Sequence, residues 1–429
     1  MHVFSARAPR LLKGILKSLP DQKRLSPVAR AYGSEGAPRV LVLTDRYLPD
    51  VGGSITWFHN VYIRHRPGTV WILTRSYPGA RAIDAVYPRL RVVRLRLERY
   101  RFLRPESLLI YAKMFIMAST LVLRHQIQVV HAGKNLPEGF VAYLLHRFWG
   151  VPYIVYAHGE EITVCSENTK LSRHQGPVYQ NAAAVVVNSR YTYGLVSALG
   201  VDSRRIVHIS PGVDPDRFLP APVPSGLRRT LNVEGKLVLL TVGRLQRRKG
   251  HDKVIEALPS ILEHVPNLVY LIAGDGEEEP ALKQLAEQRG VTEAVRFLGR
   301  IAEDQLPSLY NLSDIFLMAN RTMPGGDVEG FGIVFLEASA CGKPVVGGRS
   351  GGTADAVRDG VTGLLIDGES PESITEAVVR LARNRALRDE MGQRGREMIT
   401  AEYDWKVVAT RIESVMSRVS GVSRCRSLE

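Results

Sequence analysis

Two glutamates stand eight positions apart in the stretch "DVEGFGIVFLEASACGKPVV", residues 327–346. Glu329 follows the breaker-rich "RTMPGGDVEG" and is predicted to lie in a loop, whereas Glu337 falls inside an apolar run that indicates a buried helix. Burying an unpaired carboxylate costs on the order of several kcal/mol, so we expect a polar group to contact Glu337. The helix should begin near Phe331 or Gly332, where the unpaired N–H groups of a helix start favour an anion. The stretch therefore predicts an anion site framed by two carboxylates.

A second group of charged residues follows a predicted strand in "TVGRLQRRKGHDK". Arg244 and Lys249 stand between the strand and the next helix, framed by glycines, and two fixed cations there would suit a diphosphate. Loop cations are more often merely solvated, and we expect this of Arg247 and Arg248. Cations and a helix start at one sheet edge predict a phosphate-binding site.

His158 lies just beyond another strand, in "YIVYAHGEEI", where a histidine could contact a reacting centre or serve a structural role. Gly52 and Gly53, in "DRYLPDVGGS", would let the backbone approach a phosphate, although most glycine pairs only turn the chain. The turn lacks the G-x-G-x-x-G fingerprint, so a nicotinamide or flavin enzyme is disfavoured. No cluster of histidine and aspartate residues has the spacing of metal ligands, so the sequence predicts no metal site.

The chain length and the alternation of apolar runs with helical patterns predict the elements that position these residues. A chain of 429 residues predicts two domains, and a hydrophobic content of 45% is typical of a globular protein. Short apolar runs alternate with helical patterns from Arg39. The first runs expected to be strands are "RVLVLTD", "TVWILT", "RVVRL", "IQVVHA", "PYIVYAHG", "AAVVVNS" and "RIVHIS". The proline-rich "SPGVDPDRFLPAPVPSG" then interrupts the alternation, which restarts with "KLVLLTVG", "NLVYLIAGDG", "AVRFLG", "DIFLMA", "KPVVGG" and "TGLLID". We predict an α/β protein: two doubly wound, Rossmann-like domains with parallel sheets, facing across a cleft at the carboxyl ends of their strands.

The predicted boundaries give a basic N-terminal extension (1–38), a first Rossmann-like domain (39–210), a second Rossmann-like domain (211–400) and a C-terminal helix and tail (401–429). The last helices are expected to close the second domain and pack back onto the first. The extension lacks the apolar core of a secretory signal, and a transit peptide, an amphipathic segment and a plain tail stay open.

The net charge and the cysteine content limit which partners and which cellular compartment the sequence predicts. The formal net charge of +14 indicates an anionic partner, which could be nucleic acid, an acidic lipid surface or a phosphorylated substrate. A basic zone, residues 89–104, precedes the apolar run "LLIYAKMFIMASTLVL", which is predicted to be a buried helix or, alternatively, an element on an anionic membrane. Three scattered cysteines indicate a reducing compartment, with Cys341 expected to pack rather than react.

The chain from about residue 39 to residue 419 resembles the retaining glycosyltransferases of the GT-B fold, family four (group 1). Motifs in the same order carry the resemblance: "PDVGGS", "AHGEE", "VVNSRYT", "ISPGVDPDRF", "VGRLQRRKG", "IAGDGEEEP", "VRFLGRI", "EGFGIVFLEASACGKPVV" and "SGGTADAVRDGVTGLL". The wording is most similar to GDP-mannose-dependent phosphatidylinositol mannoside mannosyltransferases. The resemblance implies a metal-independent, retaining transfer of a hexose, with mannose from GDP-mannose as the first choice and a UDP-sugar as the alternative donor.

The resemblance implies that the first domain (39–210) binds the acceptor and that the second (211–400) binds the nucleotide sugar. It also implies roles for matching residues. The catalytic set it implies comprises His158, near the anomeric centre, with Glu329, Arg244 and Lys249. The set implied to bind the donor, which is the only cofactor-like molecule expected, comprises Gly53, Arg244, Lys249, Glu329, Phe331, Gly332, Ile333 and Glu337. Within that set Arg244 and Lys249 would neutralise the diphosphate and Glu337 would bind the ribose. Ser189 and Arg190 are weaker candidates.

Partners and rival functions follow from the same residues. The expected partners are a nucleotide-sugar donor, a lipid-linked or saccharide acceptor and an anionic membrane surface, at a cytoplasmic location or peripherally on the inner face of the membrane. A sugar-nucleotide epimerase and a catalytically inactive scaffold are weaker alternatives. A basic nucleic-acid-binding or membrane-binding protein without catalysis is a rival of another class, but no nucleic-acid-binding module is present.

Overall fold

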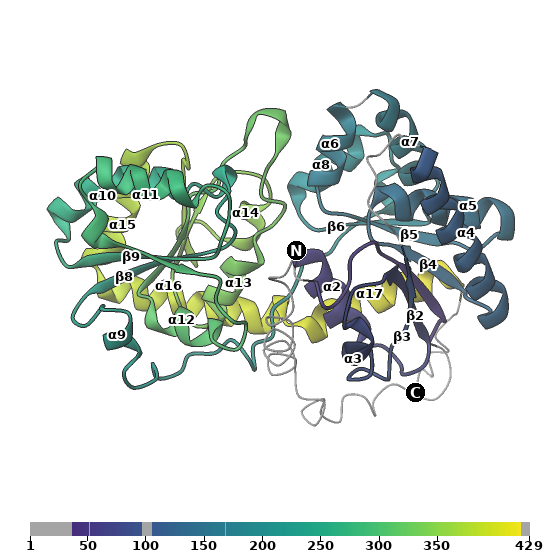
Figure 1. Cartoon of the computed structure of the whole chain (residues 1–429), viewed down its shortest axis with the longest axis horizontal. Coiled ribbons are helices and arrows are strands. Elements are labelled where there is room, and N and C mark those ends of the chain that lie inside the picture. Colours follow the sequence, from purple (N-terminus) through teal and green to yellow (C-terminus); the bar gives the residue numbers. More distant parts are fainter. Residues whose placement is uncertain (1–36, 51, 97–104, 168, 422–429) are drawn as a thin grey trace, which may run out of the picture. The chain divides into compact units, whose positions relative to one another are not determined.

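The computed structural model describes residues 37–50, 52–96, 105–167 and 169–421 (Figure 1). They form two compact units, one comprising the chain up to Ser210 together with the segment from Trp405, and the other Pro211–Asp404. The predicted basic extension and the second half of the basic zone lie outside the described residues.

A seven-stranded parallel sheet forms the centre of the first unit, in the order β3-β2-β1-β4-β5-β6-β7. Its strands are β1 (Val40–Leu43), β2 (Val70–Arg75), β3 (Arg91–Leu95), β4 (Val129–Ala132), β5 (Tyr153–Ala157), β6 (Ala184–Val187) and β7 (Ile206–His208). Each corresponds to one of the predicted apolar runs. The order reverses direction between β1 and β4, and such switch points are where ligands bind in this architecture.

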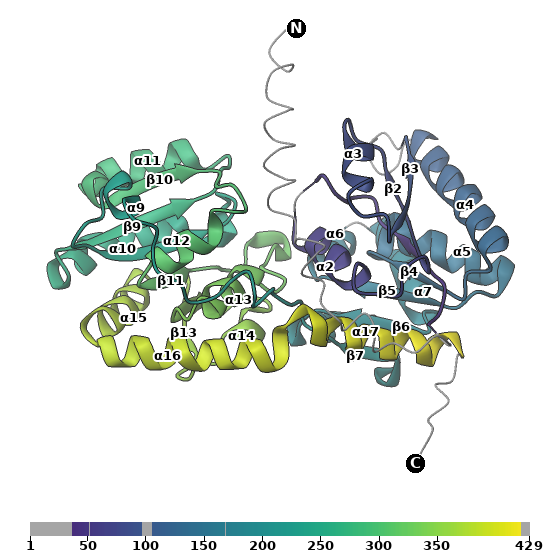
Figure 2. The same ribbon diagram turned by 90° about the horizontal axis from the view of Figure 1, so that it is seen from below.

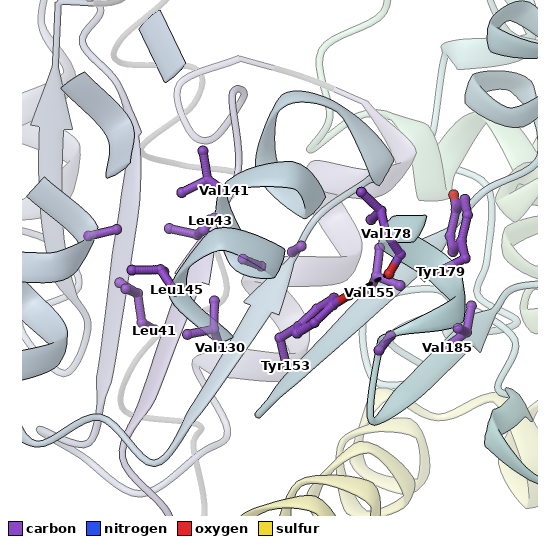
Figure 3. Packing of buried hydrophobic residues seen from close by; sticks show 14 of the residues in the cluster. Leu41, Leu43, Val130, Val141, Leu145, Tyr153, Val155, Val178, Tyr179 and Val185 are labelled. Carbon is purple, nitrogen blue, oxygen red and sulfur yellow. Dashed lines mark hydrogen bonds between the residues drawn. The ribbon is translucent and has the colours of Figure 1, made fainter. Parts of the chain in front are cut away.

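Helices cover both faces of this sheet. They are α2 (Gly53–Tyr62), α3 (Ala80–Asp84), α4 (Pro105–His125), α5 (Phe140–Trp149), α6 (Glu160–Glu167), α7 (Thr169–Gln180), α8 (Arg190–Ala198) and α17 (Trp405–Ser420). Alternate residues of a strand point to opposite faces of the sheet. Leu41 and Leu43 therefore belong to the hydrophobic cluster that includes residues of α4 and α5 (Figure 3), whereas Val40 and Val42 belong to the cluster on the opposite face. On that other face α17 contributes Trp405, and Figure 2 shows the helix against the first sheet. The predicted return of the last helix onto the first domain is therefore confirmed.

The apolar helix α4 is buried on one face only. Met114 and Ala118 are fully buried in the core, whereas Leu108 and Ile116 are 73% and 65% exposed. The prediction of a buried helix therefore holds for one face of α4 only. Within the part of the chain that the structure describes, the stretch Leu108–His125 is also the one helical segment long and apolar enough to cross a membrane, a test that core helices pass as well.

The second unit contains a six-stranded parallel sheet in the order β10-β9-β8-β11-β12-β13. Its strands are β8 (Leu237–Val242), β9 (Leu268–Ala273), β10 (Val295–Gly299), β11 (Ile315–Met318), β12 (Val345–Gly348) and β13 (Gly363–Ile366). Its helices are α9 (Leu227–Thr230), α10 (His251–His264), α11 (Glu279–Gln288), α12 (Leu306–Leu312), α13 (Ile333–Ala340), α14 (Thr353–Ala356), α15 (Pro371–Arg383) and α16 (Arg385–Met398). All six strands match predicted runs, and two buried clusters line the two faces of the sheet.

Candidate functional site

The loop that follows β8 is held against the end of β11, its neighbour across the switch point of the second sheet. It passes through Arg244 and a short 3-10 turn, Arg247–Lys249, before α10 begins. Gly250 has φ +73°, and a Cβ there would lie 1.9 Å from the carbonyl oxygen of Ala319, just beyond β11. Because only glycine tolerates both the left-handed backbone and this close approach, it fixes where the basic loop lies.

Two cations of this loop converge on one carboxylate. Lys249 Nζ donates a short hydrogen bond to Glu329 Oε2, and Arg248 Nη1 donates to the same oxygen at 3.1 Å. The side chains of Lys249, Arg248 and Glu329 are 11%, 8% and 13% exposed. Burial by itself would raise the pKa of Glu329, but the nearby charges of Lys249 and Arg248 outweigh it and hold that pKa below its ordinary value. Glu329 is therefore ionised at neutral pH and ties the basic loop to the segment before α13.

The expectation that Arg247 and Arg248 are both solvated is wrong for Arg248. Arg248 is 7% exposed, and its Nε also lies 3.2 Å from Asp327 Oδ1. Arg247 is exposed, as expected, and pairs with Glu278 at 3.2 Å. The tight turn directs successive side chains to different sides, so one arginine faces solvent and the next enters the protein.

Arg244 differs from Lys249 in having no carboxylate in direct contact among the described residues, although its charge helps to lower the pKa of Glu329. Its side chain is exposed, and it forms no ion pair or side-chain hydrogen bond with the residues that the structure describes. The two predicted cations thus lie on one loop. Within the described part of the chain Lys249 is paired with Glu329, whereas Arg244 has no ion-pair partner. To bind an incoming anion, the Lys249 ammonium group would have to divide its contacts between that anion and Glu329, or break its contact with Glu329.

The start of α13 lies within two residues of the predicted position. The helix begins at Ile333 with Gly332 as its N-cap, at φ +89°. Among the described residues, no acceptor contacts the backbone N–H groups of Phe331, Gly332 and Ile333. These donors, with the partial positive charge of the helix start, supply the features of an anion site.

Glu337 has the polar partner that its apolar surroundings predicted. The Tyr310 hydroxyl in α12 donates to Glu337 Oε2 at 2.6 Å, and Oε1 has no hydrogen-bond partner in the described part of the chain. Burial raises the pKa of Glu337, and the hydrogen bond from Tyr310 opposes this rise. Sequence reasoning missed Tyr310, although a tyrosine on the apolar face of a helix signals that its hydroxyl needs a partner. Nearby, Cys341 is buried and burial raises its pKa to about 12, which suits packing rather than a nucleophile.

In the first unit, His158 follows β5 in a fixed orientation. Its Nε2 lies 3.0 Å from the carbonyl oxygen of Gly133 after β4, so Nε2 carries the proton in this contact because a carbonyl only accepts. The backbone N–H of His158 donates to Glu161 Oε1 at 2.7 Å, and its ring packs edge-on against Trp57 and Phe58. The ring is therefore held at the carboxyl edge of the first sheet.

A polar cluster that sequence reasoning missed occupies the switch point between β1 and β4. Lys134 Nζ lies 3.0 Å from Asp45 Oδ2, and the backbone N–H of Asp45 donates to Glu138 Oε1 at 2.7 Å. Glu138 is 1% exposed, and burial raises its pKa well above the ordinary value while Lys134 opposes the rise. The signal in the sequence was the run of polar residues in "HAGKNLPEG" directly after a predicted strand.

The remaining candidates of the first unit have simpler positions. Gly53 is exposed and is the first residue of α2. Ser189 is buried and caps α8 by accepting a hydrogen bond from the Thr192 N–H at 3.2 Å, which accounts for it as a structural residue. Arg190 is exposed at the start of the same helix. Gly53, His158, Ser189 and Arg190 belong to the first unit, and the other predicted site residues share one sheet edge of the second.

Comparison with known proteins covers both units. A family model described as Glycosyl transferases group 1 matches residues 227–398, and one described as Glycosyltransferase Family 4 matches residues 62–217. A GDP-mannose-dependent alpha-(1-6)-phosphatidylinositol monomannoside mannosyltransferase from Mycobacterium tuberculosis is 31% identical over 383 residues, 87% of this chain and 97% of the relative. The enzyme of the same name from Mycolicibacterium smegmatis is 35% identical over 302 residues, 69% of this chain and 78% of the relative.

Other relatives and solved structures extend the comparison. A D-inositol 3-phosphate glycosyltransferase from Corynebacterium urealyticum is 31% identical over 298 residues, 64% of this chain and 68% of the relative. Among solved structures, HepE from Anabaena in complex with UDP superposes with a TM-score of 0.75 at 20% identity, covering 89% of this chain and 100% of that chain. At that identity the likeness shows the fold, which is the two-domain α/β fold predicted from the sequence.

Proposed function

Because the chain belongs to the group 1, family four glycosyltransferases, we propose that it transfers a mannosyl residue from GDP-mannose to a lipid-linked or saccharide acceptor. It is a hexosyltransferase. The observation that carries the choice of mannose is that relatives named as GDP-mannose-dependent mannosyltransferases align with as much as 87% of the chain at 31% identity.

The donor would lie at the carboxyl edge of the second sheet. Breaking the sugar–phosphate bond builds negative charge on the departing diphosphate, and fixed cations and helix-start N–H groups lower that barrier. Arg244 is exposed and unpaired among the described residues, so its guanidinium can bind the diphosphate without first breaking an ion pair. Lys249 then exchanges part of its contact with Glu329 for a phosphate oxygen, and the N–H groups at the start of α13 add neutral donors. This arrangement would make the transfer independent of a metal ion.

The sugar and ribose are assigned to the two glutamates. Glu337 uses its unoccupied oxygen to accept hydrogen bonds from ribose hydroxyls while Tyr310 holds the other oxygen. Glu329, freed in part from Lys249, accepts from hydroxyls of the transferred sugar. Retention follows if the acceptor hydroxyl attacks the anomeric carbon on the face that the diphosphate leaves. The carbon–phosphate oxygen bond breaks as the new carbon–oxygen bond forms, and a leaving phosphate oxygen takes the acceptor's proton.

A donor panel tests the proposal directly. The purified full chain is given GDP-mannose, UDP-glucose, UDP-N-acetylglucosamine or ADP-glucose with a phosphatidylinositol-based acceptor, and nucleotide release and product mass are measured. We expect GDP release with mannosylated product, with an α-linkage by NMR and no loss of rate in EDTA. Turnover of a UDP-sugar but not of GDP-mannose would overturn the donor assignment.

Lys249→Ala tests the diphosphate assignment, with Arg247→Ala as a matched control on the same turn. Losing one preorganised contact to the leaving group costs roughly 2.7–4 kcal/mol in the barrier, or about 100- to 1,000-fold in kcat. Arg247 is exposed and should be neutral to within a factor of a few. Circular dichroism checks that both variants fold. Near-normal turnover of folded Lys249→Ala protein would sink the assignment.

Attachment to an anionic membrane surface is part of the same proposal, because a lipid-linked acceptor lies there. The exposed apolar residues Leu108, Leu109, Ile116 and Leu123 give α4 a face suited to a lipid interface. Co-sedimentation with acidic vesicles at low salt should be reduced by Ile116→Asp. Failure of the unmodified protein to sediment with such vesicles would contradict this part of the proposal.

A further inference from the structure

A cavity of about 530 Å³ lies at the amino-terminal edge of the first sheet, and no residue assigned to the transfer site is among the described residues that line it. It is lined by residues before β1, in the turn before β2, at the start of β3 and at the end of α4. The strands are parallel, so His158 and Lys134 lie at the opposite edge of the same sheet. The six residues of β2 separate the two edges by about 20 Å. The cavity is therefore distinct from the proposed transfer site.

The cavity is lined by four arginines, which with one histidine we call the arginine pocket. These residues are Arg39, Arg66, Arg91, Arg124 and His125. No aspartate or glutamate is among the described residues that line it. A helix C-terminus carries roughly half a negative charge, so the end of α4 offsets only a small part of four guanidinium charges. The pocket thus holds an excess of positive charge with no carboxylate in it.

The contacts of the arginines leave their charges uncompensated. The Arg39 guanidinium donates to neutral groups of Gln126, the backbone oxygen at 3.2 Å and Oε1 at 2.8 Å, and forms no ion pair with the residues that the structure describes. Arg91 lies over the Trp71 ring, 4.7 Å from its centroid, a contact that uses the face of the guanidinium and not its N–H edge. Arg66 and Arg124 are exposed and form no ion pair with any residue that the structure describes.

The floor of the pocket is rigid. Trp71 is 4% exposed, and His125 stacks on it at 4.8 Å between ring centroids with 24° between planes. Burial and the charges of Arg124 and Arg91 lower the pKa of His125, as the excess of positive charge in the pocket requires. A bound anion would reverse that effect and raise the pKa of His125.

We propose that the arginine pocket binds a phosphate group of a small phosphorylated molecule or headgroup. Guanidinium groups match phosphate oxygens in paired, forked hydrogen bonds, and a dianion suits four positive charges better than a carboxylate does. The volume falls in the range of small-molecule sites and exceeds what a bare phosphate fills, so the ligand carries further polar atoms. The phosphate could belong to a soluble metabolite or to a lipid headgroup, since exposed Leu123 adjoins Arg124 at the end of α4.

The test uses the full chain and a double variant, Arg91→Gln with Arg124→Gln, both at exposed positions. The matched control, Arg81→Gln with Arg147→Gln, removes the same charge from exposed positions of the same unit outside the pocket. Binding of glycerol 3-phosphate is measured by calorimetry. Binding of vesicles of phosphatidylcholine, with and without phosphatidic acid, is measured by sedimentation.

We expect the pocket variant to lose at least about tenfold in affinity for one of these probes, and the control to lose far less. Loss for glycerol 3-phosphate identifies a soluble ligand, and loss for the phosphatidic acid vesicles alone identifies a headgroup. The His125 pKa, followed by NMR, should rise with the bound probe. Lys249→Ala should leave this binding unchanged, which separates the pocket from the donor site. Equal binding by the pocket variant, the control and the unmodified protein would overturn the proposal.

Discussion

Replacing Glu329 by glutamine removes the one carboxylate shared by two cations in the second unit. Glu329, Lys249 and Arg248 have side chains 13%, 11% and 8% exposed, so the cluster is nearly buried. Breaking a buried ion pair by removing one partner costs about 3–5 kcal/mol, because the other charge stays buried without compensation. Arg248 keeps its contact with Asp327 at 3.2 Å, so Lys249 is the cation left alone. We therefore expect a loss near the lower end, about 3 kcal/mol of unfolding free energy at neutral pH.

The pH dependence of this loss has a definite sign. The folded pKa of Glu329 is lowered, so its stabilisation is present above the unfolded pKa and is lost as pH falls through the folded value. The difference between Glu329→Gln and the unmodified protein should accordingly shrink below about pH 4.3, the ordinary value for a glutamate. A difference that stays constant through that range would contradict the assignment of an ionised Glu329.

Urea unfolding separates the two units. All four tryptophans, Trp57, Trp71, Trp149 and Trp405, belong to the first unit, so their fluorescence reports on it, whereas far-UV circular dichroism reports on both. Glu329→Gln should move the dichroism transition to lower urea and leave the fluorescence transition in place. As a control, Asp389→Asn breaks an exposed pair with Arg385, 3.6 Å apart, and should cost under about 1 kcal/mol. A Glu329→Gln protein within about 0.5 kcal/mol of the unmodified protein would refute the buried cluster.

Further predictions concern two other buried contacts. Tyr310→Phe removes the 2.6 Å hydrogen bond to Glu337 and should cost about 1.5–3 kcal/mol in urea unfolding. In a Glu337→Gln background the amide oxygen still accepts from the Tyr310 hydroxyl, so the same change should cost less, about 0.5–1.5 kcal/mol, the range of a hydrogen bond between neutral groups. His59 and His131 are buried with pKa values lowered to about 3, so below about pH 6.5 only their unfolded forms take up protons. The free energy of unfolding of the first unit should therefore fall by about 1.4 kcal/mol per histidine for each pH unit of acidification. His131→Gln should remove one such contribution. An unfolding free energy, followed by fluorescence, that stays constant between pH 6 and 5 would contradict this prediction.

The elements of the fold were predictable because their signals are local. All thirteen strands coincide with predicted apolar runs, and α13 begins within two residues of the expected position. Helix α4 was harder to predict, because a long apolar segment can be buried all round or on one face. Its exposed Leu108 and Ile116 depend on how far neighbouring helices cover it, which no local pattern records.

The candidate site was predicted only in part. The residue types at the strand ends indicated which side chains lie near a diphosphate, but not which of them already bind one another. Arg248 was expected in solvent, and Tyr310 was not identified, although they contact Glu329 and Glu337 across 81 and 27 positions of sequence. Such pairs depend on which strand ends are neighbours in the sheet.

The sequence by itself determined the alternation of strands and helices, the glycines that let loops approach closely, and the presence of cations and glutamates at strand ends. Only the tertiary structure decided that Lys249 is paired with Glu329 while Arg244 has no ion pair within the described ranges, and that arginines at positions 39, 66, 91 and 124 line one cavity. The physical reason is range. Backbone preference and hydrophobic periodicity act over a few residues, whereas a charge interacts with whatever the sheet order places within a few ångströms of it.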